Sequence, residues 1–65
     1  MKRTVVKKIS EKKHISISEA EKCFMKYAKD FADDVFYIEF CGILIYGLNL
    51  TIKEAAYVHN YLKAI

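Results

Sequence analysis

The sequence predicts a single α+β domain over residues 1–65, with its elements in the order α-α-β-β-α. Apolar residues recur at helical spacing over residues 16–34 and again over residues 51–65. Between these two segments, residues 35–48 (VFYIEFCGILIYGL) are β-branched and aromatic, a composition typical of strands. The 65 residues contain no proline and only two glycines. We therefore expect one compact unit without a linker.

The first helix is predicted over residues 4–13 (TVVKKISEKK). Thr4 is a candidate cap, and Val5, Val6 and Ile9 would share the inner side. The same valines and isoleucine also suit a short strand, because β-branched residues favour strands. The polar continuation SEKK favours the helix.

The second helix is predicted to run from Ser16 to about Asp34. Ser16 and Glu19 form a capping box, in which the serine oxygen accepts an unpaired backbone N–H. Ser18 and Glu21 form a competing box further along the chain. The apolar face predicted for this helix consists of Ala20, Cys23, Phe24, Tyr27, Ala28, Phe31, Ala32 and Val35.

Residues 35–48 are predicted to form a short antiparallel hairpin. Gly42 divides them into VFYIEF and ILIYGL, and a turn at Cys41-Gly42 would use the conformational freedom of glycine. A bulge or a longer bent strand is the alternative at this turn. A transmembrane span is excluded, because the run is shorter than the roughly 20 residues required and contains Glu39.

This hairpin would be apolar on both faces, so one face would lack cover within so short a chain. We therefore expect a homodimer. Its predicted interface residues are Phe36, Ile38, Phe40, Ile43 and Ile45.

The last fifteen residues (TIKEAAYVHNYLKAI) are predicted to form a terminal amphipathic helix. Thr51 and Glu54 make a second capping box. The residues expected on its inner face are Ala55, Val58, Tyr61, Leu62 and Ile65.

The order of elements and several short motifs resemble the body of the histone-like HU/IHF family. Glu11-Lys12, Ile15-Ser16 and Glu19-Ala20-Glu21-Lys22 follow the family pattern EK-x-G-L-S-x-x-x-A-E around its first turn. A second set of positions lies where the family's first strand carries V-x-L-x-G-F-G; it consists of Val35, Ile38 and Phe40. The resemblance implies an HU-like body that associates with DNA and dimerises.

Two departures from the family pattern limit what the resemblance implies. His14 stands where the family has its turn glycine, although histidine is enriched at positive φ. The long basic arm and its Arg-Asn-Pro tip are absent, since Gly47 leads almost directly into Thr51. Bending of DNA by a proline wedge is therefore not expected.

The basic residues are concentrated at the amino terminus. Residues 1–14 carry six cations and one acid, a net charge of +5, whereas residues 15–65 carry a net charge of −2. A local basic patch favours a polyanionic partner that is held through its phosphates. The alternative is a solvated, lysine-rich amino terminus without a partner. The predicted DNA-binding residues are Lys2, Arg3, Lys7, Lys8, Lys12 and Lys13.

The sequence contains no pattern of an enzyme, since it has no phosphate-binding loop, nucleophile elbow or paired catalytic acids. Cys23, Cys41, His14 and His59 lack the spacing of a zinc site, so neither a metal nor a cofactor is expected. Two cysteines without a CxxC motif or a signal peptide indicate a cytoplasmic protein with reduced thiols.

Two functions follow as hypotheses. The first is weak, non-specific binding of duplex DNA through the basic amino-terminal helix. The alternative is a protein-interaction module, an inhibitor or regulator of the phage type, which acts by dimerising or by binding a host protein without contacting DNA.

Overall fold

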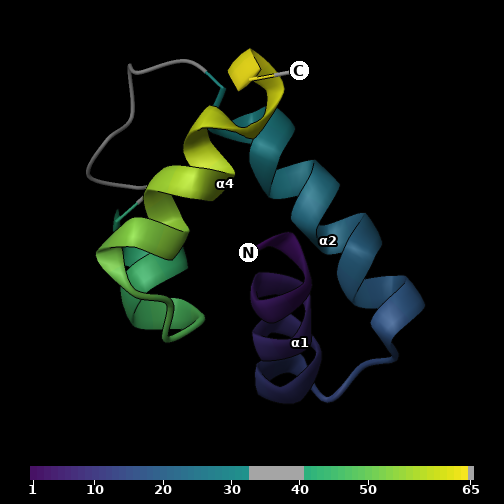
Figure 1. Ribbon diagram of the computed structural model, residues 1–65. Helices are drawn as coiled ribbons and strands as arrows, with labels where there is room; N and C mark the ends of the chain where they lie inside the picture. Colours follow the sequence, from purple (N-terminus) through teal and green to yellow (C-terminus); the bar gives the residue numbers. More distant parts are fainter. Residues whose placement is uncertain (33–40, 65) are drawn as a thin grey trace.

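The computed structural model describes residues 1–32 and 41–64, and these residues form four helices (Figure 1). Helix α1 spans Lys2–Lys13 and α2 spans Ile17–Asp30. A seven-residue π-helix, η2, spans Cys41–Gly47, and α4 spans Ile52–Ala64. The described part of the chain contains no strand.

The predicted α+β class is therefore wrong for the described residues. The second strand of the expected hairpin, residues 43–48, lies in η2 and in the turn that follows it. The first strand, residues 35–40, lies outside the described residues. Strand propensity measures how well a side chain suits a half-buried surface, and tertiary packing overrides it readily. Here the buried residues Leu44 and Leu48 lie four positions apart, which is helical spacing.

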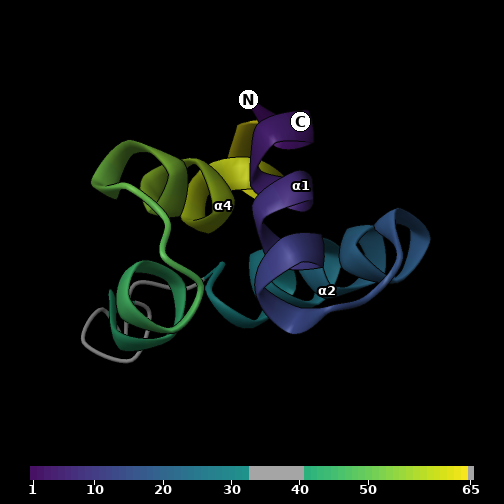
Figure 2. The ribbon, with the colours of Figure 1, turned by 90° about the horizontal axis from the view of Figure 1, so that it is seen from below.

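Helices α2 and α4 converge at one end of the molecule, and α1 lies between their diverging ends (Figures 1 and 2). Helix α2 packs against both α1 and α4, and η2 packs against α4. The amino terminus lies between α2 and α4 in the view of Figure 1. This arrangement places the basic helix α1 in contact with the rest of the protein along more than one side.

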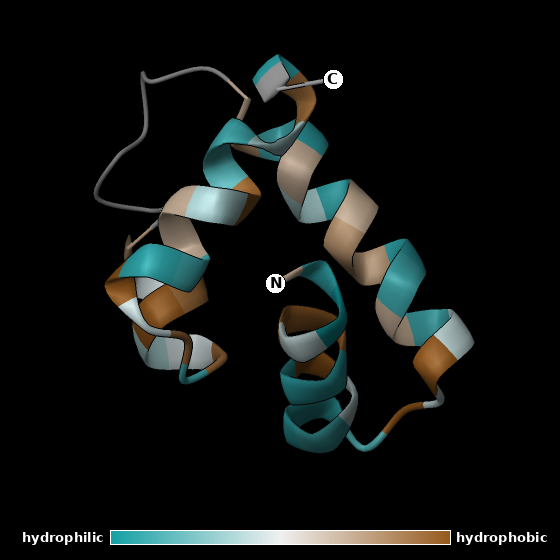
Figure 3. Cartoon of the chain, in the orientation of Figure 1, coloured by the Kyte–Doolittle hydropathy of each residue, from teal (hydrophilic) through white to brown (hydrophobic). Residues whose placement is uncertain are grey.

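The core is formed by small and medium side chains from all four helices. Its largest fully buried members are Phe24, Ile9, Leu44, Val5 and Val58. The visible side of α1 is mostly hydrophilic, whereas hydrophobic residues gather on η2 (Figure 3). The inner face expected for α1, formed by its two valines and Ile9, is confirmed.

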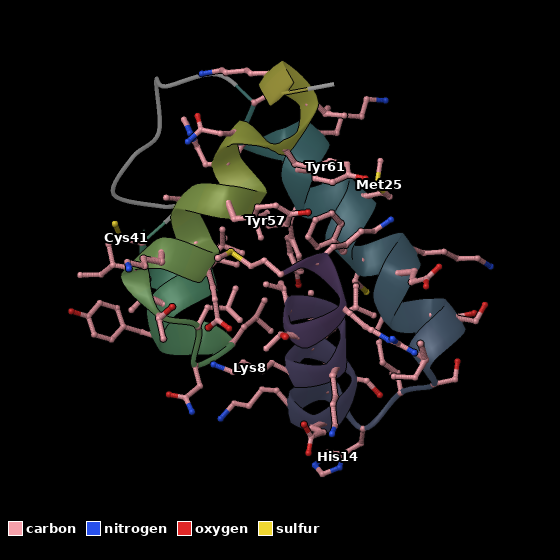
Figure 4. The ribbon with its side chains drawn as sticks, viewed as in Figure 1. Lys8, His14, Met25, Cys41, Tyr57 and Tyr61 are labelled. Atoms are coloured by element: carbon pink, nitrogen blue, oxygen red, sulfur yellow. The ribbon has the colours of Figure 1, made fainter. Side chains whose placement is uncertain are left out.

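Three aromatic rings join α2 to α4. The ring centroids of Phe24 and Tyr61 lie 4.9 Å apart in an edge-to-face arrangement, and Tyr57 packs against both rings at 6.0 and 5.7 Å. Figure 4 shows Tyr57 and Tyr61 projecting from α4 toward α2. Such pairs add about 0.5–1.5 kcal/mol each beyond the apolar area that they bury.

The connection between α1 and α2 depends on His14. Its backbone has φ 56° and ψ 48°, the left-handed conformation that ends many helices. The N–H groups of His14 and Ile15 both donate to the carbonyl oxygen of Ser10, and the hydroxyl of Ser10 donates to the carbonyl of Ile15 at 2.6 Å. This turn therefore pairs the backbone groups that the helix end would leave unpaired.

Helix α1 begins at Lys2 and has Met1 as its cap, so the expected cap at Thr4 is wrong. The cap of α2 at Ser16 is confirmed, since the Ser16 hydroxyl accepts from the N–H of Glu19 at 3.1 Å. Helix α2 ends at Asp30, earlier than expected. Phe31 leaves the helix and is 6% exposed in the core, while the expected end at Asp34 lies outside the described residues.

Helix α4 begins with a complete capping box. The N–H of Glu54 donates to the hydroxyl of Thr51 at 3.1 Å, and the N–H of Thr51 donates to the Glu54 carboxylate at 2.9 Å. The box predicted from the sequence is therefore confirmed with both of its hydrogen bonds. Val58 and Ala55 are fully buried on the inner face of this helix.

Candidate functional site

Two of the six predicted DNA-binding cations are held by the protein itself. The ammonium group of Lys8 lies 2.7 Å from the carboxylate of Glu54, and Figure 4 shows the Lys8 side chain directed away from α2. The ammonium group of Lys2 lies 5.6 and 5.5 Å from the ring centroids of Phe24 and Tyr61. Both side chains are partly buried, so they stabilise the packing of α1 and are poorly placed to contact phosphates.

The carboxyl of Glu54 receives several hydrogen bonds in this arrangement. Burial acts to raise its pKa. Hydrogen bonds from Lys8 and from the N–H and hydroxyl of Thr51, together with the Lys8 charge, outweigh burial and hold the pKa below its ordinary value. Glu54 is therefore ionised at neutral pH and forms a charged contact between α4 and α1.

The four other predicted cations are exposed, but they do not form one patch. Arg3 and Lys7 lie one turn apart on α1 and border a cleft beside α2. Lys12 borders a different depression, together with Leu48 and Asn49 after η2. Lys13 lies at the end of α1, with its ammonium group 3.4 Å from the hydroxyl of Tyr27. Because an α-helix turns by about 100° per residue, the cations of α1 are distributed over several of its sides.

A second row of exposed cations lies on α2. Lys22, Lys26 and Lys29 are all exposed and follow one another at spacings of four and three residues. Lys22 lies 3.7 Å from the carboxylate of the exposed Glu19. An exposed pair of this kind contributes little stability.

An exposed region with several apolar side chains lies where η2 meets the beginning of α4. We call it the η2–α4 surface. A groove of about 340 Å³ runs through it. The groove is lined by Cys41, Ile45, Tyr46, Ile52, Ala56, His59 and Asn60. Tyr46 is 82% exposed and Ile52 is 72% exposed.

The predicted dimer-interface residues divide between several places. Ile45 lies in the groove and is half-buried, while Ile43 is 43% exposed and does not line it. Phe36, Ile38 and Phe40 lie outside the described residues. Sequence reasoning missed Tyr46 and Ile52, because it assigned the first to a strand and counted only the inner face of the last helix. The exposure of Ile52 could have been predicted, because Ile52 directly follows the cap Thr51 and is not one of the residues that share the inner face of the helix.

The described residues hold no group of three or more His, Cys, Asp or Glu side chains that could bind a metal ion. Cys23 and Cys41 are half-buried free thiols. His14 lies at the turn after α1 (Figure 4), whereas His59 lies on α4 beside the groove. Over residues 1–32 and 41–64, no helix has both the length and the apolar character needed to span a membrane.

Comparison of the chain with models of protein families, with curated proteins and with solved structures found no match. The candidate sites are therefore assigned from the positions and chemistry of this chain's own residues.

Proposed function

We propose that this protein is an interaction module that self-associates through the η2–α4 surface. The observation that carries the proposal is the position of Tyr46 and Ile52. Both are large apolar side chains, both are more than two-thirds exposed, and both line the same groove. Single exposed apolar residues are common, but adjacent ones around a groove are typical of an interaction surface.

A second copy of the chain fits this surface better than a charged partner does. None of the seven groove residues is Lys, Arg, Asp or Glu, so two such surfaces can meet without removing a charged side chain from water. The surface offers both a groove and the projecting ring of Tyr46, as a two-fold symmetric contact requires of each partner. A chain of 65 residues also buries a smaller fraction of its surface than a larger domain, and dimerisation compensates for this.

Light scattering over a concentration series tests the proposal. The wild-type chain is expected to change from monomer to dimer as its concentration rises. Ile52→Asp is the most informative variant, because Ile52 is the first residue of α4 and acidic residues are favourable there. The substitution should therefore prevent association and leave the helix intact by circular dichroism. Tyr46→Asp provides a second variant at the groove.

Met25→Asp is the matched control. Met25 is 40% exposed on α2, and Figure 4 shows it on the opposite side of the molecule from the groove residue Cys41. It should dimerise like the wild type. A wild-type chain that remains monomeric at millimolar concentration, or equal loss of the dimer in Met25→Asp, would overturn the proposal.

A second candidate function is weak, sequence-independent binding of duplex DNA. It is supported by the exposure of Arg3, Lys7, Lys12 and Lys13 on a helix that contains a single acid, Glu11. No ion pair occupies these four cations within the described residues. With four cations at most, the slope of log affinity against log salt should be no steeper than about −3.6, at roughly −0.9 per phosphate.

Retention of duplex DNA at low salt tests this second function. Changing the four exposed cations of α1 to Gln should abolish retention. The control changes Lys22, Lys26 and Lys29 of α2 to Gln, and it should retain DNA if α1 forms the contact. Equal losses in the two variants would indicate attraction by net charge alone, and absence of wild-type retention at the lowest salt would exclude the function.

A further inference from the structure

A cleft lies between α1 and the first turns of α2. Its volume is about 780 Å³. It is lined by Lys2, Arg3, Thr4, Val6, Lys7, Ile17 and Glu21. Neither proposed function uses it as a pocket, and it is separate from the η2–α4 groove.

The α1 wall of this cleft is cationic. It carries Lys2, Arg3 and Lys7, and the only acid in the lining is Glu21. The lining therefore has three positive charges against one negative charge. The ammonium group of Lys2 is partly fixed by the rings of Phe24 and Tyr61, so one of the three cations is already ordered before any ligand arrives.

The remaining lining consists of Thr4 and two apolar residues, Val6 and Ile17. Val6 is 4% exposed, and Ile17, on the α2 wall, is 51% exposed. A hydrated inorganic anion would gain nothing from these two side chains. An anion attached to a short hydrocarbon body would gain by covering Ile17, because burial of apolar area is favourable, whereas Val6 has little area left to bury.

We propose that this cleft binds a small amphiphilic anion, a carboxylate or phosphate monoester that carries an alkyl or aryl body. The anionic head lies against Arg3 and Lys7, since a planar guanidinium donates two parallel hydrogen bonds to a carboxylate or phosphate. The hydrocarbon body lies against the exposed side chain of Ile17. The duplex backbone is a poorer occupant, because a chain of charged phosphates cannot use the apolar side chains and meets Glu21.

NMR titration of the ¹⁵N-labelled full chain tests the proposal with defined probes. Octanoate and octyl phosphate supply the two head groups on one hydrocarbon body. Inorganic phosphate supplies charge alone, and octanol supplies the body alone. Both amphiphiles should cause saturable shifts of the amide signals of Thr4, Val6, Ile17 and Glu21. Each amphiphile should bind at least tenfold more tightly than inorganic phosphate or octanol.

The variants separate the cleft from general attraction by charge. Arg3→Gln with Lys7→Gln should weaken octanoate binding by about tenfold or more, the effect of losing charge-assisted hydrogen bonds. Lys12→Gln with Lys13→Gln makes the same change of net charge on the same helix outside the cleft, and should leave the affinity within about twofold. All four side chains are exposed, and the dispersion of the NMR spectrum confirms that each variant is folded.

Three results would overturn the proposal. They are shifts that rise linearly without saturation, inorganic phosphate that binds as tightly as octanoate, and equal weakening in the two double variants. If only one head group binds, the cleft is specific for that anion and the proposal stands in narrower form. The test is independent of self-association, since the Ile52→Asp variant should bind octanoate like the wild type.

Discussion

Replacing Glu54 with glutamine tests the charged contact that joins α4 to α1. Glu54 is 7% exposed, and its carboxylate accepts from the Lys8 ammonium at 2.7 Å and from the N–H of Thr51 at 2.9 Å. A glutamine side chain keeps an oxygen that can accept from Thr51 but loses the negative charge. The substitution therefore removes the ion pair and leaves the helix cap largely in place.

The expected cost follows from the burial of the two partners. A hydrogen bond to a charged group contributes about 1.5–3 kcal/mol. The Lys8 side chain is 35% exposed, so water screens the pair and hydrates the ammonium once its partner is lost. We therefore expect Glu54→Gln to lower the free energy of unfolding by about 1–2 kcal/mol at pH 7. Each kcal/mol corresponds to roughly 4–8 °C in Tm for a domain of this size.

The pH dependence gives an independent check. The pKa of Glu54 is lower in the folded protein than its ordinary value of 4.5. Its stabilising contribution is therefore fully present above about pH 4.5 and is lost as the pH falls through the folded-state pKa. Once Glu54 is protonated, wild type and Glu54→Gln carry the same charge at this position. The difference in unfolding free energy between them should shrink toward zero in acid.

Urea unfolding at pH values from 7 down to 3 measures both effects. A double-mutant cycle with Lys8→Met isolates the pairwise contribution. Glu19→Gln is the control, because Glu19 is exposed and lies 3.7 Å from Lys22, and it should change stability by less than about 0.5 kcal/mol. A cost at Glu54 no larger than that at Glu19, or a difference that persists unchanged in acid, would refute the reasoning.

Three further substitutions test other contacts by urea unfolding. Ser16→Ala should cost about 0.5–2 kcal/mol through loss of the α2 cap, whereas Ser18→Ala should cost less than about 0.5 kcal/mol; the reverse order would place the cap at Ser18. His14→Val should destabilise the turn by roughly 1–2 kcal/mol, because a β-branched residue is strained at φ 56°, while His14→Gly should be tolerated; equal effects would contradict the left-handed turn. Phe24→Ala should cost about 3–5 kcal/mol by leaving a cavity between α2 and α4, and a loss under about 1 kcal/mol would show that the ring is not in the core.

The starts of α2 and α4 were the features that sequence reasoning predicted best, whereas the start of α1 was predicted wrongly. Ser16 and Thr51 each cap a helix through a hydrogen bond to the residue three positions later. Such contacts depend only on a few consecutive residues, so the pattern of residue types contains most of the information. The same holds for the inner face of α2, because its fully buried residues Ala20, Phe24 and Ala28 repeat every four residues.

The conformation of residues 41–48 was not predictable in this way. Its β-branched and aromatic residues suit a strand. Whether the segment forms a strand or a helix depends on which of its side chains the rest of the fold buries. Packing against α4 buries Leu44 and leaves Ile43 exposed. That contact joins parts of the chain whose relative position the local sequence does not specify, so the sequence could not predict that Ile45 lines a groove with residues of α4.

The sequence by itself determined the caps of α2 and α4, the apolar faces of three helices and the excess of positive charge at the amino terminus. Only the tertiary structure decided what that charge does. Lys8 meets Glu54 across 46 positions of the sequence, and Lys2 lies over rings from two other helices. Counting charges treats all six cations alike, whereas packing engages two of them in contacts within the protein and leaves the other four exposed on several sides of α1. Local hydrogen bonds extend over three or four residues and follow from the sequence, but contacts between distant residues exist only once the helices have packed.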